Sequence, residues 1–466
     1  MIRVAVVGGG ISGLSAAYRL RELLGAGVEL TVLEQSGRLG GKLRTIELAG
    51  GPYDVGAEAF LARRPEVRSI ATRLGIAEDI VHPEPVRATI RAGGRSNPIP
   101  AGTVMGVPAS AGAVADVLPP DALRRVACEP DQPPLRWRRG GAGNDLAVGD
   151  LLRQRFGTEV AERLVDPLLG GVYAGRADAL GVRATMPALA AALDAGETSL
   201  LRAAASLLPA AGGDAGPVFG AFRGGYRQLV DRLVASSGAR VRTGLPVHSL
   251  RRHGSRWQLE IGAAPGPGSW TADAVVLAVP APAAAKLLTG VAPAAAAAYA
   301  RIELASMAVV AMALPLSVTL PAASGVLLAS GERHAHGEPF TAKALTYSSR
   351  KWQHLAGERV LVRGSVGKYG EASVLRRSDA ELLRAVRADL AELTGITAAP
   401  VASAVLRWGG GLPQYGVGHL DTVAEIEQAV SAVPGLAVAG ASLHGVGVPA
   451  CVATGWAAAE RLARYL

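Results

Sequence analysis

The sequence predicts an α/β protein of two domains, one of which is a parallel-sheet domain assembled from segments that lie far apart in the chain. Residues 2–7 form an apolar run of strand length, followed by three glycines and a helical pattern. A second strand at 28–33 completes a unit of strand, turn, helix and strand, the size of a parallel crossover. Buried strands at 274–279 and 436–439 indicate that this sheet draws on distant parts of the chain.

The composition agrees with a large folded protein. With 466 residues, 49% of them apolar and 19% charged, the chain is several times a single-core domain and is not expected to be disordered. Its two cysteines, Cys128 and Cys451, exclude a disulfide framework and a four-cysteine zinc site. No ligand spacing is seen among the histidines, so no metal site is predicted. The lack of disulfides and of a secretory leader predicts a cytoplasmic location.

The formal net charge of +9 comes almost entirely from arginine, because lysine occurs only at 42, 286, 343, 351 and 368. Two explanations stay open: a compositional bias, or attraction to an acidic ligand or an anionic lipid surface. Peripheral association with the inner face of the membrane is compatible with the second. Aromatic residues make up 4% and no basic tract is interleaved with them, so nucleic acid is not an expected partner.

One stretch, Leu304 to Ser330, carries no charge and is long enough to cross a bilayer as a helix. Pro315 and Pro321 would break such a helix. Two or three buried strands separated by turns explain the stretch better, and no transmembrane span is predicted.

The remaining elements follow from periodicity. Helices are predicted at 66–74, 146–164, 186–210, 378–394 and 449–465. Strands are predicted at 240–250 and 256–261, a Gly/Pro turn follows at 262–268, and sequence typical of strands continues to about 370. The insert 129–145, rich in Pro, Gly and Arg, is predicted to be an exposed loop, although Trp137 between two arginines also suits contact with a membrane surface.

The predicted domains are discontinuous. The dinucleotide-binding domain comprises 1–50, 216–281 and 402–466, and the substrate domain comprises 51–84 and 282–401, with a mainly helical, substrate- or membrane-facing part at 85–215.

The sharpest motif is the GxGxxG formed by Gly8, Gly10 and Gly13 between the first strand and the first helix. Gly8 permits a tight turn, Gly10 lets a pyrophosphate approach the backbone, and Gly13 lets the helix pack closely on the strand. Glu34 ends the second strand, where an acidic side chain binds a ribose diol and repels a 2′-phosphate. This favours NAD or FAD over NADP.

The segment from Arg38 to Lys42 helps to separate FAD from NAD, because paired glycines with flanking cations suit a second approach to the pyrophosphate. A solvated basic loop is the alternative. Near the end of the chain, residues 440–449 leave a strand through a glycine-rich turn and enter the last helix. Its exposed N–H groups would stabilise negative charge on a flavin. A purely structural glycine turn is the alternative.

Seven motifs follow one another along nearly the whole chain: GGGISGLSAAYRL, LEQSGRLGGKLRT, GAEAFLARRPE, LVDPLLGGVYAG, FRGGYRQLVDRL, RWGGGLPQYGVGH and GASLHGVGVPACVATG. Together they resemble the bacterial oxygen-dependent porphyrinogen oxidases. The first two are common to the wider amine-oxidase and phytoene-desaturase superfamily, whereas LVDPLLGGVYAG, LPQYGVGH and GVGVPAC are typical of the porphyrinogen branch. The resemblance implies a Rossmann-type FAD-binding domain and an inserted substrate domain with a mixed sheet and a helical part.

The resemblance also implies which residues hold FAD. They are Gly8, Gly9, Gly10, Ile11, Ser12, Gly13, Glu34, Gln35, Arg38, Gly41, Lys42, Gly56, Ala57, Glu58, Ala59, Val247, Trp408, Val446, Gly447 and Val448. Without the family, Val247 and Trp408 are equally well explained as packing residues. Two turns depart from the family pattern, since Gly56 is followed by Ala, Glu and Ala instead of Pro, an acid and Ser, and Ala450 replaces an Asp. These departures put the flavin contacts of both turns in doubt.

The implied activity is FAD-dependent oxidation of coproporphyrinogen III, and also of protoporphyrinogen IX, with dioxygen as acceptor and hydrogen peroxide as product, in heme biosynthesis. Arg64 is the first candidate for binding a substrate propionate, ahead of Arg63, Arg95 and Lys343. No catalytic acid or base is predicted, and His444 is interpreted as structural. A flavin amine oxidase, a carotenoid-type desaturase, and a non-catalytic porphyrin-binding flavoprotein that contacts the next pathway enzyme stay open as alternatives.

Overall fold

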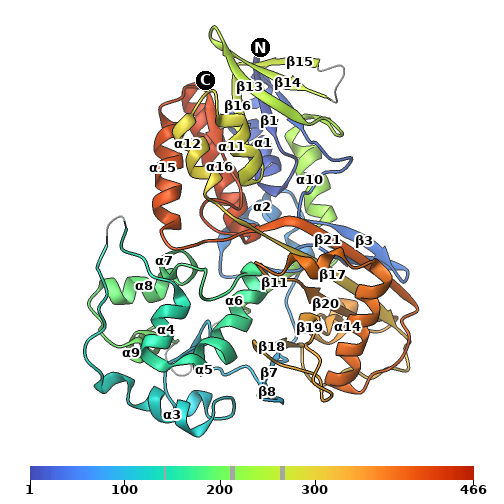
Figure 1. Cartoon of the computed structure of the whole chain (residues 1–466). Helices are drawn as coiled ribbons and strands as arrows, with labels where there is room; N and C mark the ends of the chain where they lie inside the picture. The colour runs from blue at the N-terminus through green and yellow to red at the C-terminus, as the bar shows by residue number, and fades with distance from the viewer. Residues whose placement is uncertain (141–142, 210–215, 263–267) are drawn as a thin grey trace. The chain divides into compact units, whose positions relative to one another are not determined.

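The structure, a computed structural model, describes residues 1–140, 143–209, 216–262 and 268–466. They form two compact units (Figure 1). The first unit comprises Met1–His82, Pro217–Glu303 and Asp421–Leu466, and the second comprises Pro83–Gly216 and Leu304–Leu420. The α/β class predicted from the sequence is confirmed.

The first unit contains a parallel sheet of five strands. In spatial order these are β12 (Arg240–Arg242), β2 (Val28–Leu33), β1 (Ile2–Val7), β16 (Ala274–Leu277) and β22 (Leu436–Val438). All four residues of β16 are buried, which agrees with a strand covered on both faces. Strands from the two ends of the chain therefore lie in one sheet.

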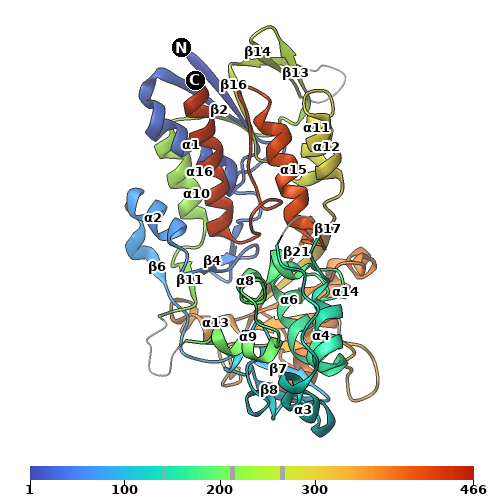
Figure 2. The ribbon, with the colours of Figure 1, turned by 90° about the vertical axis from the view of Figure 1, so that its left-hand side faces the viewer.

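Helices cover both faces of this sheet, as Figure 2 shows for α1, α10 and α16 on one side and α11, α12 and α15 on the other. Their bounds are Ile11–Leu24, Arg227–Ser237, Val448–Tyr465, Ala281–Leu288, Pro293–Ala300 and His419–Ser431. Alternate side chains of β1 serve the two faces, since Val4 and Val6 join the core with α1 and α16, while Ala5 and Val7 join the core with α11 and α15.

Smaller elements complete the first unit, and their pairing accounts for boundaries that differ from the predicted ones. The short strand β11 (Phe219–Phe222) pairs with both β5 (Phe60–Leu61) and β6 (Ile80–Val81), which places residues 51–82 in this unit. Residues 282–303 also lie here, because α11 and α12 pack on the parallel sheet. The other elements are the hairpin β3 (Thr45–Leu48) and β4 (Gly51–Asp54), helix α2 (Pro65–Arg73), and the sheet of β13 (Val247–His253), β14 (Arg256–Ile261) and β15 (Gly268–Ala272).

The second unit is built on a sheet of seven strands. Their order is β21 (Ala402–Pro413), β17 (Leu304–Leu314), β20 (Val360–Val366), β19 (Ala342–Thr346), β18 (Gly325–Leu328), β7 (Thr89–Ala92) and β8 (Arg95–Pro98). The pairs are antiparallel except β18 with β7. Helix α14 (Asp379–Thr394) begins with a capping box between Ser378 and Glu381 and packs Leu382, Val386 and Leu390 on the sheet.

The uncharged stretch 304–330 forms β17 and β18 of this sheet, so the prediction of buried strands is confirmed. No helix among the described residues is both long enough and apolar enough to span a bilayer.

The helical part of the second unit is more broken than the sequence predicts. The stretch 146–164 is divided at Gly157, whose φ of +84° ends α4 (Val148–Phe156). The chain continues with α5 (Thr158–Val160), a π-helical turn (Ala161–Val165) and α6 (Asp166–Tyr173). The stretch 186–209 is divided at Gly196 into α8 (Pro187–Asp194) and α9 (Leu200–Ser206). Helices α3 (Pro120–Ala127) and α7 (Val182–Thr185) accompany them.

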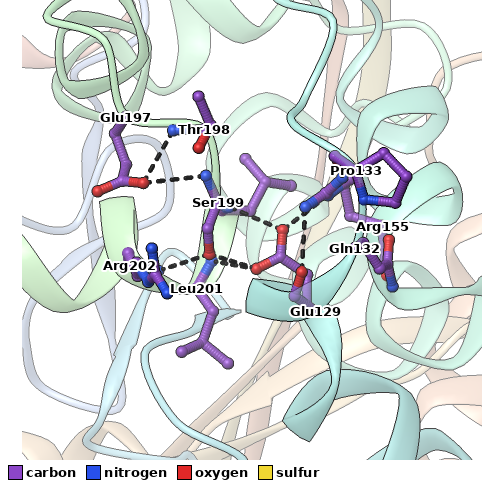
Figure 3. A network of polar contacts seen from close by, with 10 residues as sticks. Glu129, Gln132, Pro133, Arg155, Glu197, Thr198, Ser199, Leu201 and Arg202 are labelled. Carbon is purple, nitrogen blue, oxygen red and sulfur yellow. Dashed lines mark hydrogen bonds and ion pairs between the residues drawn. The ribbon is translucent and has the colours of Figure 1, made fainter.

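The interpretation of 129–145 as an exposed loop is wrong at its start. Glu129 is fully buried and lies at the centre of a polar network with Arg155 and Ser199 (Figure 3). Trp137 is held within the unit as well, because its indole Nε1 donates to Asp194 over 2.8 Å and Arg183 stacks on its ring. Residues 141–142 of this insert, residue 210 at the end of the predicted 186–210 helix, and 263–267 of the predicted Gly/Pro turn lie outside the described residues.

The predicted strand 240–250 is two strands, β12 and β13, which belong to different sheets. The break falls at Gly244, which has a φ of +69°.

Candidate active site

The first glycine turn joins β1 to α1 and leaves backbone N–H groups open. A Cβ on Gly8 would lie 2.2 Å from the carbonyl oxygen of Ala278, and one on Gly13 would lie 2.0 Å from that of Gly8, so neither position admits a side chain. Gly10 is less crowded, since a Cβ there would be in ordinary van der Waals contact with the Cα of Gly41, at 3.9 Å. Helix α1 has no side-chain cap and no acid in its first turn. This is the open, positively polarised terminus that a phosphate requires.

Glu34 lies beside this turn, as its place at the end of β2 predicts. Its Oε2 accepts a hydrogen bond from the N–H of Gly9 at 2.7 Å, and its Oε1 accepts one from the N–H of Ser36 at 2.8 Å. Each carboxylate oxygen keeps a further lone pair, so the group can still accept bonds from two ribose hydroxyls.

The second glycine turn, at 38–42, packs directly on the first. The N–H of Gly40 donates to the carbonyl of Gly9 at 2.8 Å, and a Cβ on Gly41 would lie 3.1 Å from the Cα of Gly10. The Arg38 guanidinium donates to the carbonyl of Gly41 at 2.8 Å and so supports the shape of the turn. Gln35, on the chain between the two turns, is exposed.

Two further turns, at 56–59 and 446–448, lie beside the first two. The carbonyl of Lys42 accepts a bond from the N–H of Ala57, and a Cβ on Gly56 would lie 1.9 Å from that carbonyl oxygen. The turn from Val446 to Val448 starts α16, whose N-terminus likewise lacks a side-chain cap and an acid. Burial lowers the pKa of Lys42, while Cys451 in the first turn of α16 acts on it in the opposite direction.

Ser12 and Cys451 connect the first and last helices at this point. Burial raises the pKa of the Cys451 thiol, while Lys42 and a hydrogen bond with Ser12 act in the opposite direction. Four segments that are far apart in sequence, 8–13, 34–42, 56–59 and 445–448, are thus brought together within the first unit. We call this set of turns the glycine cradle.

The other predicted residues have different surroundings. Val247 starts β13, two residues after Leu245, whose N–H donates to the carbonyl of Glu34, so it is held next to the cradle. Trp408 lies in β21 of the second unit, opposite Met307.

Arg64 precedes α2, and its guanidinium is paired with Glu66, which raises the pKa of Arg64. His444 is exposed and its Nε2 lies 2.6 Å from Glu427.

The second unit contains a cavity of about 390 Å³ that sequence reasoning found only in part. Lys343, predicted as a minor candidate, lines it, together with Asp166, Ser330 and Lys368, which were missed. These residues come from distant segments and share no motif. One signal was available: in a chain whose cations are almost all arginine, a lysine marks a position where a compact ammonium is used.

A group of possible metal ligands also lies in the second unit, although no metal site was predicted. Ligand atoms of His334, His336 and Glu392 lie within 4.8 Å of one another. All three groups already have protein partners, because His334 Nε2 lies 2.8 Å from Asp389, His336 Nε2 lies 3.6 Å from Glu338, and Glu392 accepts a bond from the N–H of Ala335.

Comparison with known proteins identifies the family. A family model described as flavin containing amine oxidoreductase matches residues 11–463, nearly the whole chain. The chain belongs to this flavin-containing amine oxidoreductase family. It is an oxidoreductase, and its cofactor is FAD, as the motifs predict.

Within the family, a coproporphyrinogen III oxidase of Mycobacterium leprae is 46% identical over 459 residues, which cover 98% of this chain and 97% of the relative. The crystal structure of an Exiguobacterium protein assigned as a protoporphyrinogen oxidase superposes with a TM-score of 0.86, at 29% identity, over 100% of this chain and 99% of that one. Cyclohexylamine oxidase from Brevibacterium oxydans gives a TM-score of 0.71 over 99% of each chain at 17% identity, which shows a shared fold alone. The resemblance to porphyrinogen oxidases predicted from the motifs is confirmed.

The glycine cradle fits the flavin cofactor of this family. Open N–H groups at the amino termini of α1 and α16 suit the anionic parts of a dinucleotide, and the two acceptors of Glu34 suit a ribose. The departures from the family pattern at Ala57, Glu58 and Ala59 leave the turn itself intact, since Gly56 keeps the close approach to Lys42.

Proposed function

We propose that this protein oxidises coproporphyrinogen III to coproporphyrin III, with dioxygen as the electron acceptor, as a step of heme biosynthesis. One observation carries the proposal: the Mycobacterium leprae protein of that name matches 98% of this chain at 46% identity, with no large segment missing from either protein. Protoporphyrinogen IX, the related dicarboxylate, is a second substrate to be compared.

The reaction removes six hydrogen atoms from the macrocycle, as six electrons and six protons, and three molecules of dioxygen take them up as three molecules of hydrogen peroxide. FAD, when bound, supplies this two-electron redox chemistry in three successive cycles. The protein's own contribution is to hold and orient the reactants and to keep water out.

Named residues account for the holding of the cofactor. The amino terminus of α1 offers N–H groups to a pyrophosphate, Glu34 accepts bonds from a ribose, and the N–H groups from Val446 to Val448 favour negative charge at the start of α16. Gln35, Arg38, Lys42, Val247 and Trp408 complete the proposed set.

Substrate recognition calls for cations, because coproporphyrinogen III carries four propionates. Arg64 remains the candidate proposed from the sequence. Its guanidinium is already paired with Glu66 on the surface, so a propionate would have to share or replace that partner.

The decisive experiment is anaerobic mixing of the purified, FAD-loaded protein with coproporphyrinogen III. Loss of the visible flavin absorbance, followed after admission of air by porphyrin fluorescence and peroxide, is the expected result. Protoporphyrinogen IX, a panel of amines and a polyene are tested in parallel. A flavin that stays oxidised with both porphyrinogens overturns the proposal. Reduction by an amine or a polyene alone would indicate the corresponding oxidase or desaturase, and tight porphyrin binding without reduction would indicate a carrier.

Two further parts of the proposal concern partners. The net charge of +9 supports peripheral association with an anionic membrane face. The need to pass the porphyrin on within the pathway supports a transient contact with the next enzyme. Co-sedimentation with vesicles of anionic and of neutral lipid tests the first. Binding to the neutral vesicles alone, or to neither, overturns it.

A further inference from the structure

The cavity of the second unit is walled by three parts of the fold. Asp166 begins α6, Ser330 and Lys343 belong to the segments that follow β18 and form β19, and Lys368 follows β20. All of them lie in the second unit, whose sheet and α6 position the side chains. The volume of about 390 Å³ accommodates a carboxylate arm.

Lys343 is a buried cation without an anionic partner. The residue is only 8% exposed, and its Nζ donates to the carbonyl of Gly367 at 2.8 Å. Among the described residues no carboxylate lies within ion-pair distance of it. An ammonium group has three donors, so two are left for a ligand or for solvent. A buried charge in this condition is costly for the folded protein.

Lys368 makes the same region more positive. Its Nζ lies 3.4 Å from Asp166 Oδ2, which also accepts a bond from the Ser330 hydroxyl at 2.6 Å, while Asp166 Oδ1 accepts one from the N–H of Ala177. The Asp166 carboxylate is therefore already engaged with Lys368, Ser330 and Ala177. Two ammonium groups and one carboxylate leave one positive charge unbalanced, and Lys368 lies near enough for its charge to act on Lys343.

The outer charges of the cavity do not supply the missing anion. Each outer carboxylate that lines the cavity already has an arginine partner. Glu371 pairs with Arg176, Glu162 and Asp178 pair with Arg153, and Glu332 pairs with Arg91. A monocarboxylate between the two lysines would balance the charge, whereas a dianion would reverse it.

We propose that Lys343 and Lys368 form a binding site for one propionate of the tetrapyrrole substrate. The proposal rests on the function proposed above and assigns to it a specific pair of residues. A propionate carboxylate accepts bonds from both ammonium groups.

The test compares Lys343→Met and Lys368→Met with Lys286→Met, which removes an exposed lysine of α11 and serves as the matched control. Kinetics with coproporphyrinogen III and equilibrium binding of the product, coproporphyrin III, are measured for each, together with FAD content and folding. We expect the KM and the dissociation constant to rise roughly 30-fold in the two site variants, as for loss of one partner of a buried charge pair. The kcat and the FAD content should stay unchanged, and Lys286→Met should behave as the wild type.

Each outcome decides between the two proposals. If the wild type turns over and the site variants keep its KM and binding, the propionate site is wrong and the function stands. If the wild type neither reacts with nor binds the porphyrins, both proposals are wrong. If Lys343→Met does not fold, Lys368→Met carries the test, because its side chain is closer to the surface and its loss leaves Asp166 bonded to Ser330 and Ala177.

Discussion

Arg155 donates from its Nε to Glu129 Oε1 over 2.7 Å, in an ion pair whose side chains are 5% and 0% exposed (Figure 3). Glu129 also accepts bonds from the Ser199 hydroxyl and from the N–H groups of Leu200 and Leu201. The pair ties the segment after α3 to α4 and to the start of α9, so one carboxylate organises much of the helical part of the second unit.

Replacing Glu129 by Gln should destabilise this unit strongly, because Arg155 then keeps a buried charge without its counter-ion. We expect the free energy of unfolding to fall by about 3–5 kcal/mol. Urea unfolding followed by circular dichroism measures it, with Asp121→Asn in the exposed pair with Arg124 as control. Equal midpoints for the two variants would show that the buried pair contributes nothing.

Gly56→Ala should weaken the retention of FAD. A Cβ at this position would lie 1.9 Å from the Lys42 carbonyl oxygen, so the turn at 56–59 must move away from the turn at 38–42. Gly290→Ala is the control, because a Cβ there meets no atom within 4 Å. The FAD-to-protein ratio after purification is the measurement. A ratio equal to that of the control would show that the close approach has no role in holding the cofactor.

Glu34→Gln should also lower the affinity for FAD. The carboxylate accepts from the N–H groups of Gly9 and Ser36, whereas an amide presents one acceptor and one donor, so one N–H loses its partner. Loss of a hydrogen bond to a charged group corresponds to a roughly 10–100-fold weaker binding. Titration of the apoprotein with FAD provides the dissociation constant, and an unchanged value would remove Glu34 from the proposed cofactor contacts.

Lys343→Met should stabilise the ligand-free protein in a pH-dependent manner. Burial, with Lys368 adding to it and Glu371 opposing it, lowers the pKa of Lys343 from 10.5 to about 7. The folded state therefore binds fewer protons than the unfolded state between about pH 7 and pH 10.5, and the stability of the wild type rises with pH across this window. The advantage of the Met variant is then largest below pH 7 and fades towards pH 10.5. Urea unfolding at pH 6 and at pH 9.5 tests this, and an advantage that grows with pH would contradict it.

Arg64→Ala should raise the KM for coproporphyrinogen III if a propionate replaces Glu66 as the partner of the guanidinium. We expect a moderate effect of roughly 3–10-fold, because the side chain is 44% exposed and the pair is screened by solvent. Steady-state kinetics at two salt concentrations measures it. An unchanged KM removes Arg64 from the substrate site.

The parts of the fold that were predicted correctly depend on local patterns. β1, β2, α14 and α16 were found because a run of apolar residues or a helical period is complete within each segment. The helices around Gly157 and Gly196 were predicted as longer than they are, because an Ala- and Leu-rich sequence hides breaks that depend on a single positive φ.

The candidate site was likewise predicted where its residues follow a motif, and missed where they meet only through long-range packing. The turns at Gly10 and Gly41 were predicted from their glycine motifs, whereas the turn at Gly56 was predicted only from the family resemblance. The cavity around Lys343 and Lys368 was not, because the two lysines and Asp166 come together only through the pairing of β18, β19 and β20 and the packing of α6. Long-range packing leaves no periodic trace in the sequence.

The order in which the ribosome makes the chain has a consequence for the cradle. β1 is synthesised first, but its sheet gains β22 only after all of the second unit has been made, and α16 then packs so tightly on α1 that a Cβ on Gly455 would lie 2.3 Å from the carbonyl oxygen of Ser12. The last turn of the cradle, Val446 to Val448, follows β22 in the chain. A nascent chain that has not yet reached Val448 therefore lacks this turn, so its cofactor site stays incomplete until the whole second unit has been made.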